Sequence, residues 1–163
     1  MGSRATLEMV VAAIDPRLAA SGRLARARAA ARGALETAHV GGIIPVPWSD
    51  TRYPTALAAI TDPPPVLWTR GDPDALGAPA VAIVGSHAGS AYARDVGREL
   101  GSGLARRGVT VVSGLARGVD SAAHRGALAV DGRTVGVLGS GVDIVYPPEH
   151  NGWRVPWCGG GRS

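Results

Sequence analysis

The sequence predicts an α/β protein: an incomplete Rossmann-like parallel sheet with helices on both faces, preceded by a small helical segment. Three observations within residues 80–147 predict this class. Three short apolar runs each end at a glycine or a Ser-Gly pair, two segments with apolar residues at helical spacing separate these runs, and the connecting loops are short. Strands and helices that alternate in this way form parallel sheets through right-handed crossovers.

The three predicted strands are residues 81–84, 109–112 and 134–138. Each is rich in valine, as is typical of strands that are buried on both faces of a sheet. Consecutive crossovers on one side of the sheet place the strands in the spatial order third, second, first, and all three carboxyl ends then lie at one edge. Ligands of open α/β sheets bind at that edge, so the loops there are the candidate site.

Two predicted helices lie between these strands. In the first, apolar residues recur every four positions over residues 92–104, which gives the helix one apolar face. Ser90 precedes this helix in an N-cap position, and Gly108 ends it. The second helix covers residues 121–130, with Asp120 as its predicted N-cap.

The chain divides into four predicted parts. Residues 1–40 form an N-terminal helical segment whose second half is dense in Ala and Arg; this basic face could be a nucleic-acid arm, but a solvated face is the expectation. Residues 41–79 are rich in proline and predict an extended connector. Residues 80–151 make up the partial Rossmann-like domain. Residues 152–163 have no helical or strand period and are predicted as a disordered tail.

The composition excludes several function classes. All 17 basic residues are Arg, and the absence of Lys excludes a P-loop nucleotide hydrolase and a Schiff-base enzyme. The single cysteine, Cys158, can form no disulfide within the chain and no cysteine-based metal cluster, which fits a reducing compartment. The sequence shows no secretion signal and no apolar run long enough for a membrane span. We therefore expect a cytoplasmic protein with no membrane segment.

The loop after the first strand, Gly85 to Ser90, is a candidate anion site. Backbone N–H groups at a helix N-terminus, together with the helix dipole, favour a phosphate. Ser86 and Ser90 add hydroxyl donors, and Gly85 allows a close approach to the backbone. The alternative is an ordinary tight turn without a ligand, in which glycine serves the backbone geometry alone.

The loop after the second strand contains Ser113, Gly114, Arg117 and Gly118. A dinucleotide-binding domain would carry Asp or Glu at the end of this strand for the ribose hydroxyls. Ser113 and Gly114 stand there instead, so NAD is not expected and we predict no cofactor. Arg117 places a cation above the sheet edge, where its guanidinium could clamp a phosphate or stack on a base. The alternative is a loop arginine without a ligand.

No catalytic or metal site is predicted. Asp120 and His124 share a helix face and could form a proton-transfer pair. We interpret Asp120 instead as a helix cap and His124 as a structural residue of the helix. The four histidines are far apart in sequence without ligand-type spacing, and the sequence contains no Gly-x-Ser-x-Gly nucleophile elbow.

Three runs form a longer pattern. Residues 84–87 read Val-Gly-Ser-His, and residues 113–124 read Ser-Gly-Leu-Ala-Arg-Gly-Val-Asp-Ser-Ala-Ala-His. Residues 139–147 read Gly-Ser-Gly-Val-Asp-Ile-Val-Tyr-Pro. In order and spacing they resemble the DNA-processing protein A (DprA/Smf) family, in which Val-Gly-Ser-Arg, Ser-Gly-x-Ala-(Arg/Lys)-Gly-Ile-Asp-x-x-Ala-His and Gly-x-Gly-x-Asp-x-x-Tyr-Pro follow one another. The resemblance covers residues 45–151. It implies a cytoplasmic, non-enzymatic protein of natural transformation that binds incoming single-stranded DNA, protects it and helps load the RecA recombinase.

The resemblance also implies where DNA binds within residues 80–151. Ser86 lies in the loop that lines the family's DNA pocket, and Arg117 matches the basic residue of the second loop. His87 stands where the family has an Arg, and because a histidine is mostly neutral at pH 7, one clamp on the DNA is weakened. The predicted nucleic-acid-binding residues are Gly85, Ser86, His87, Ser90, Ser113, Gly114, Arg117 and Gly118.

The family's later half, with an Arg-Asn-Arg segment, further strands, the homodimer contact and much of the RecA-binding surface, is not found in this sequence. The first strand is therefore expected to have an open apolar edge. Two alternatives stay open. One is an enzyme resembling the cytokinin-activating phosphoribohydrolases, although their Pro-Gly-Gly-x-Gly-Thr loop does not occur here. The other is a non-functional remnant, suggested by the truncation and the atypical tail.

Overall fold

A computed structural model of the chain describes residues 17, 22–144 and 157–159. The chain divides into two compact units, residues 1–40 and 41–163. In the first unit, α3 (Arg23–Val40) lies within the predicted helical segment. The start of that segment, the Tyr-Pro end of the third motif and most of the predicted tail lie outside the described residues. No helix in the described part of the chain is long and apolar enough to cross a membrane.

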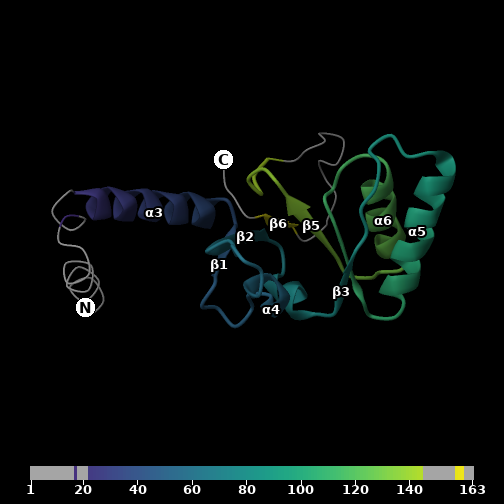
Figure 1. The fold of residues 1–163 in the computed structure, drawn as a ribbon, viewed down its shortest axis with the longest axis horizontal. Helices are drawn as coiled ribbons and strands as arrows, with labels where there is room; N and C mark the ends of the chain where they lie inside the picture. The colour runs from purple at the N-terminus through teal and green to yellow at the C-terminus, as the bar shows by residue number, and fades with distance from the viewer. Residues whose placement is uncertain (1–16, 18–21, 145–156, 160–163) are drawn as a thin grey trace. The chain divides into compact units, whose positions relative to one another are not determined.

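The second unit contains the predicted alternation of strands and helices (Figure 1). In chain order the elements are β3 (Ala80–Ala82), α5 (Ala91–Ala105), β4 (Thr110–Ser113), α6 (Val119–Leu128) and β5 (Thr134–Leu138). β3 pairs in parallel with β4, and β4 pairs in parallel with β5. The predicted Rossmann-like parallel sheet, with its strands in the order third, second, first, is therefore confirmed.

Helices α5 and α6 lie side by side and cover one face of this sheet (Figure 1). Small and branched side chains fill the core on this face: Ile83, Ala105, Val111, Ala123 and Ala127. A 3-10 helix, η1 (Pro73–Gly77), covers the other face, where Ala75 and Val135 pack with the partly buried Val112. Helical elements thus lie on both faces, as the sequence predicts.

The two helices touch backbone to backbone at two glycines. A Cβ placed on Gly101 would meet the carbonyl oxygen of Ala123, and a Cβ on Gly126 would meet the carbonyl oxygen of Arg98. Only 4% of the residues are aromatic. Close approach of the helices therefore replaces large side chains as the means of reaching the packing density of a protein interior.

Three further strands extend the sheet beyond β5, and the full order is β1-β2-β6-β5-β4-β3. β6 (Trp157–Gly159) is parallel to β5 and antiparallel to β2 (Val66–Arg70). The prediction of a disordered tail over residues 152–163 is therefore wrong for residues 157–159. The physical reason is that two strand edges offer unpaired N–H and C=O groups, and a short segment between them satisfies both.

The proline-rich segment, which the sequence predicts as a connector, contributes to the same sheet. β1 (Ile44–Pro47) pairs antiparallel with β2 and lies at one end of the strand order. The two prolines of β1 are compatible with this place because an edge strand need not donate every N–H to the ladder. After β1, the short helix α4 (Thr55–Ala58) follows, and the Tyr53 hydroxyl donates to the carbonyl oxygen of Pro64 at 2.7 Å.

β3 lies at the opposite end of the strand order and pairs with β4 alone among the described strands. The side chains of Val81 and Val84, in and just after this strand, are 42% and 75% exposed. This edge is the open apolar edge that the sequence predicts for the first strand of the parallel sheet.

Candidate nucleic-acid interface

Two loops meet at the carboxyl ends of β3 and β4. We call residues 85–90 and 114–118 the paired loops. The N–H of Val119 donates to the carbonyl oxygen of Ser86 at 3.3 Å. Gly118 has a φ of 77° and lies so close to the first loop that a Cβ there would overlap the same carbonyl oxygen. The sequence predicts both loops at one sheet edge, and the structure brings them into direct contact.

Asp120 connects the two strand ends. Its Oδ1 accepts a hydrogen bond from the N–H of Gly85 at 3.3 Å, and its Oδ2 accepts one from the N–H of Gly114 at 3.0 Å. The sequence predicts Asp120 as the N-cap of α6, and this is wrong: Gly118 takes that position without a side-chain cap, and Asp120 lies buried in the first turn. The reason is that a carboxylate has two acceptor oxygens and here satisfies donors from two separate strands.

These two hydrogen bonds of Asp120 determine which groups of the paired loops are available to bind an anion. The N–H groups of Gly85 and Gly114 are directed to Asp120, so a phosphate cannot use them. The predicted site residues whose side chains are exposed are Ser86, His87, Ser90 and Arg117. These side chains, rather than the strand-end amides, form the candidate binding surface.

Ser86 and Ser90 order the first loop while each keeps a donor. The Ser90 Oγ accepts from the N–H of Ala93 at 3.2 Å, which confirms Ser90 as the N-cap of α5. The Ser86 Oγ accepts from the N–H of Ala88 at 3.2 Å. A hydroxyl that accepts one hydrogen bond retains its own proton, so both serines can still donate to a phosphate oxygen.

Two of the predicted site residues belong to the framework of the loops. Ser113 is 2% exposed, and its hydroxyl donates to the carbonyl oxygen of Ile83 at 2.6 Å, which joins the end of β4 to the end of β3. Gly118 has no side chain to offer and makes the close contact between the loops. Both residues therefore position the loops and do not present a side chain to a ligand.

Arg94 places a cation beside the first loop, and the sequence analysis does not predict it as a site residue. Its Nη1 donates to the carbonyl oxygen of Gly89 at 2.7 Å, and the residue is exposed. It lies in the first turn of α5, where the helix dipole disfavours a positive charge. This unfavourable position is the signal in the sequence that could have pointed to a function. The guanidinium contacts the same loop in which His87 replaces the family's arginine.

His124 is a core residue. It is fully buried, and its Nδ1 lies 2.6 Å from the Oγ1 of Thr134, whose own proton is donated to the carbonyl oxygen of Val111 at 2.8 Å. The Thr134 oxygen therefore accepts from the Nδ1–H of His124. Because the carboxylate of Asp120 binds two glycine amides, the geometry favours a structural role for both residues over a proton-transfer pair. Within the described ranges, no cluster of three His, Cys, Asp or Glu residues could hold a metal ion.

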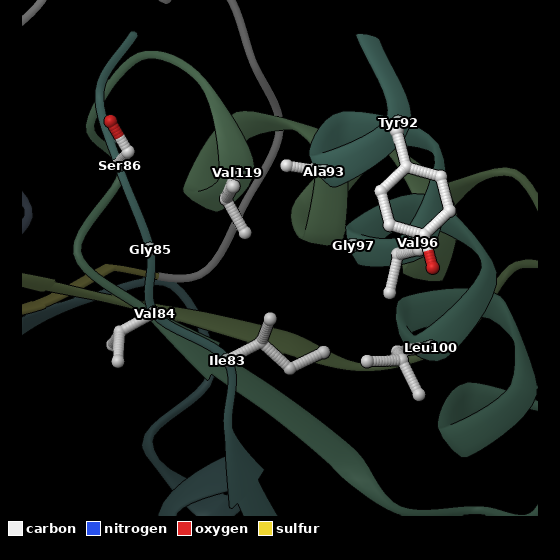
Figure 2. A pocket seen from close by; sticks show the side chains of 10 residues that line it. All are labelled: Ile83, Val84, Gly85, Ser86, Tyr92, Ala93, Val96, Gly97, Leu100 and Val119. Atoms are coloured by element: carbon white, nitrogen blue, oxygen red, sulfur yellow. The ribbon is translucent and has the colours of Figure 1, made fainter. Parts of the chain in front are cut away.

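An open hollow of about 430 Å³ lies beside the first loop, between the end of β3 and α5 (Figure 2). Its lining is mostly apolar, and its polar side chains are Ser86 and Tyr92, the latter 79% exposed. The lining residues are Ile83, Val84, Gly85, Ser86, Tyr92, Ala93, Val96, Gly97, Leu100 and Val119. The hollow therefore places apolar surface next to the Ser86 hydroxyl of the first loop.

A known protein family matches most of the second unit of this chain. Residues 45–157 match the model of the family described as DNA recombination-mediator protein A. The chain belongs to this family. The matched range contains both paired loops, Asp120 and strands β2 to β5. The resemblance found in three sequence motifs is thereby confirmed for the whole of the parallel sheet up to β5.

Two curated relatives are similar to this chain over part of their length. Protein Smf of Escherichia coli is 44% identical over 105 residues, which cover 64% of this chain and 28% of that protein. DNA processing protein DprA of Bacillus subtilis is 38% identical over 110 residues, which cover 67% of this chain and 37% of that protein. The chain thus spans about a third of the length of these relatives.

Two solved structures of DNA processing protein A share the fold. The protein from Streptococcus pneumoniae aligns with a TM-score of 0.68 and 33% identity, over 73% of this chain and 44% of that one. The protein from Helicobacter pylori aligns with a TM-score of 0.64 and 26% identity, over 74% of this chain and 56% of that one. The Helicobacter pylori structure is described as showing a single-stranded DNA binding mode.

Proposed function

We propose that the paired loops bind single-stranded DNA and that residues 80–151 are the DNA-binding part of the chain. The observation that carries the proposal is a pair of cations at the carboxyl edge of a parallel sheet: Arg117 on the second loop, and Arg94 on the first turn of α5 with its side chain bonded to the first loop. Ligands of open α/β sheets bind at this edge. The planar guanidinium of arginine donates two parallel hydrogen bonds to a phosphate. The Helicobacter pylori relative supports the choice of ligand.

Each exposed group of the paired loops has a role in this proposal. Arg117 clamps a phosphate or stacks on a base, and Arg94 neutralises a phosphate beside the first loop. Ser86 and Ser90 donate hydroxyl protons to phosphate oxygens. His87 contributes less than the arginine of the family because it is mostly neutral at pH 7. Contacts of this kind address the DNA backbone, so binding is tolerant of sequence, and no bond of the DNA is cleaved.

We infer from the family that this binding serves DNA uptake in the cytoplasm. In that role the protein protects incoming single-stranded DNA and passes it to a RecA-type recombinase. The chain spans between 28% and 37% of the two curated relatives. We assign the binding step to this chain, and the recombinase contact and the homodimer contact of the family are proposals for the whole protein.

Fluorescence anisotropy with labelled oligo(dT) tests the proposal. The wild-type chain should bind at low salt, and its affinity should fall steeply as the salt concentration rises. Arg117→Ala and Arg94→Ala should each weaken binding about tenfold, the effect of one lost hydrogen bond from a charged group. Each should also reduce the slope of log K against log salt by about 0.7, the value for one phosphate contact on a single strand.

Arg107→Ala is the matched control. The Arg107 Nη1 donates to the carbonyl oxygen of Gly103 at 2.8 Å, which is the same kind of bond that Arg94 makes with Gly89. Arg107 lies just past the other end of α5, about 20 Å away at the rise of an α-helix. Its loss should leave DNA binding nearly unchanged. Equal losses in all three variants, or no binding by a folded and monodisperse wild-type chain, would contradict the proposal.

A further inference from the structure

We propose that Asp120 is a positioning residue for DNA binding, which sets the separation of the paired loops without touching the DNA. This inference rests on the proposed function. The residue is 6% exposed, so the DNA cannot reach its carboxylate. Its two oxygens each hold a different strand end, through the N–H groups of Gly85 and Gly114. The first loop leads into α5, whose first turn carries Arg94, and the second loop carries Arg117, so the bridge fixes the distance between the two cations.

The bridge requires a carboxylate. Backbone N–H groups can only donate, and both oxygens of Asp120 accept. An asparagine at this position has one acceptor oxygen and one NH₂ group. Whichever way the amide is turned, its NH₂ group faces a backbone donor, and one strand end loses its partner. Asp120→Asn therefore removes half of the bridge while it changes the shape of the side chain very little.

The first turn of α6 packs directly against both strand ends. A Cβ on Gly114 would lie 3.0 Å from the Oδ2 of Asp120, and a Cβ on Gly85 would lie 2.8 Å from the Cβ of Val119. Glycine at both positions is what lets the carboxylate and the valine come so close. The loops are thus built around this turn, and Asp120 supplies its polar contact to each of them.

Removal of the Asp120 charge tests the proposal through the direction in which the affinity for DNA changes. A buried negative charge near the binding surface repels a polyanion, so its removal should by charge alone strengthen DNA binding. Loss of the bridge should separate the cations and weaken DNA binding. Because the two effects have opposite signs, the direction of the change in affinity separates a positioning role from a purely electrostatic one.

The experiment compares Asp120→Asn with Asp131→Asn. Asp131 is exposed in the turn after α6 with a φ of 53°, a conformation that asparagine adopts readily, so this control removes the same charge away from the paired loops. In anisotropy with oligo(dT), Asp120→Asn should bind about tenfold more weakly than the wild type, the effect of one lost charge-assisted contact. Asp131→Asn should bind at least as tightly as the wild type.

Amide hydrogen exchange of the wild-type chain gives a second test that needs no variant. The amides of Gly85 and Gly114 should be protected already in the absence of oligo(dT), because they donate to Asp120 and not to the DNA. Rapid exchange at these amides would overturn the proposal, as would wild-type affinity or tighter binding in Asp120→Asn. If the wild-type chain fails to bind oligo(dT), the proposed function is refuted and this role with it; if only the variant behaves differently from expectation, this role alone is refuted.

Discussion

Replacing Gly118 by alanine tests whether the paired loops depend on their close contact. Gly118 has a φ of 77°, and a residue with a side chain in such a region costs about 1–3 kcal/mol. The new Cβ would also overlap the carbonyl oxygen of Ser86 and lie 2.6 Å from that of His87, and neither backbone atom can rotate away. Overpacking of this kind costs about 1–3 kcal/mol. The free energy of unfolding should therefore fall by about 2–6 kcal/mol.

Gly108→Ala is the matched control for this variant. Gly108 also has a positive φ, 74°, but nothing lies within 4 Å of a Cβ placed there. It should lose only the conformational part, about 1–2 kcal/mol. Urea unfolding followed by circular dichroism measures the free energy of unfolding of both variants. In a thermal melt, each kcal/mol should correspond to about 2–4 °C in Tm. Gly118→Ala should also bind oligo(dT) more weakly. Equal losses of stability in the two variants would refute the reasoning.

Two further predictions concern the helices and the proline-rich segment. Gly101→Ala should destabilise the fold by about 1–3 kcal/mol because its Cβ would meet the backbone of Ala123. Gly103→Ala, on the same helix, should stabilise it by about 0.5–1 kcal/mol because its Cβ would meet only the Arg107 side chain, at 3.7 Å. Urea unfolding that ranks the two variants the other way would contradict this packing. The hydrogen bond from the Arg52 side chain lowers the pKa of the Asp50 carboxyl from 3.8 to about 2. The pair therefore stabilises the fold above pH 3.8, and this stabilisation is lost as the pH falls towards 2. An NMR titration of the Asp50 carboxyl should show a midpoint near 2, and a midpoint at the ordinary value would speak against the pair.

The strands and helices of residues 80–138 could be predicted from the sequence because their signals are local. Short apolar runs rich in valine predict strands over residues 81–84, 109–112 and 134–138, and apolar residues four positions apart mark α5. The serine before α5 is an N-cap in the structure, as its position predicts. The glycines that follow the strands predict both loops at one edge, because the carboxyl ends of parallel strands lie at the same edge of a sheet.

The remaining features depend on contacts between residues far apart in the sequence. β6 is short and becomes a strand because β5 and β2 offer their edges to it, which no local period shows. An aspartate before a helical pattern is usually an N-cap, so the sequence predicts that role for Asp120. Its actual partners, the amides of Gly85 and Gly114, come from two different strands. Likewise, Arg94 belongs to the site only because its guanidinium folds back onto the first loop.

Mapping the backbone amide shifts of the wild-type chain during titration with oligo(dT) tests most directly whether DNA lies across the paired loops. Residues 86–90 and 115–118 should shift, and residues 106–110 at the opposite edge of the sheet should not. Shifts confined to the arginine-rich helix α3, with none in the paired loops, would contradict the placement of the DNA site.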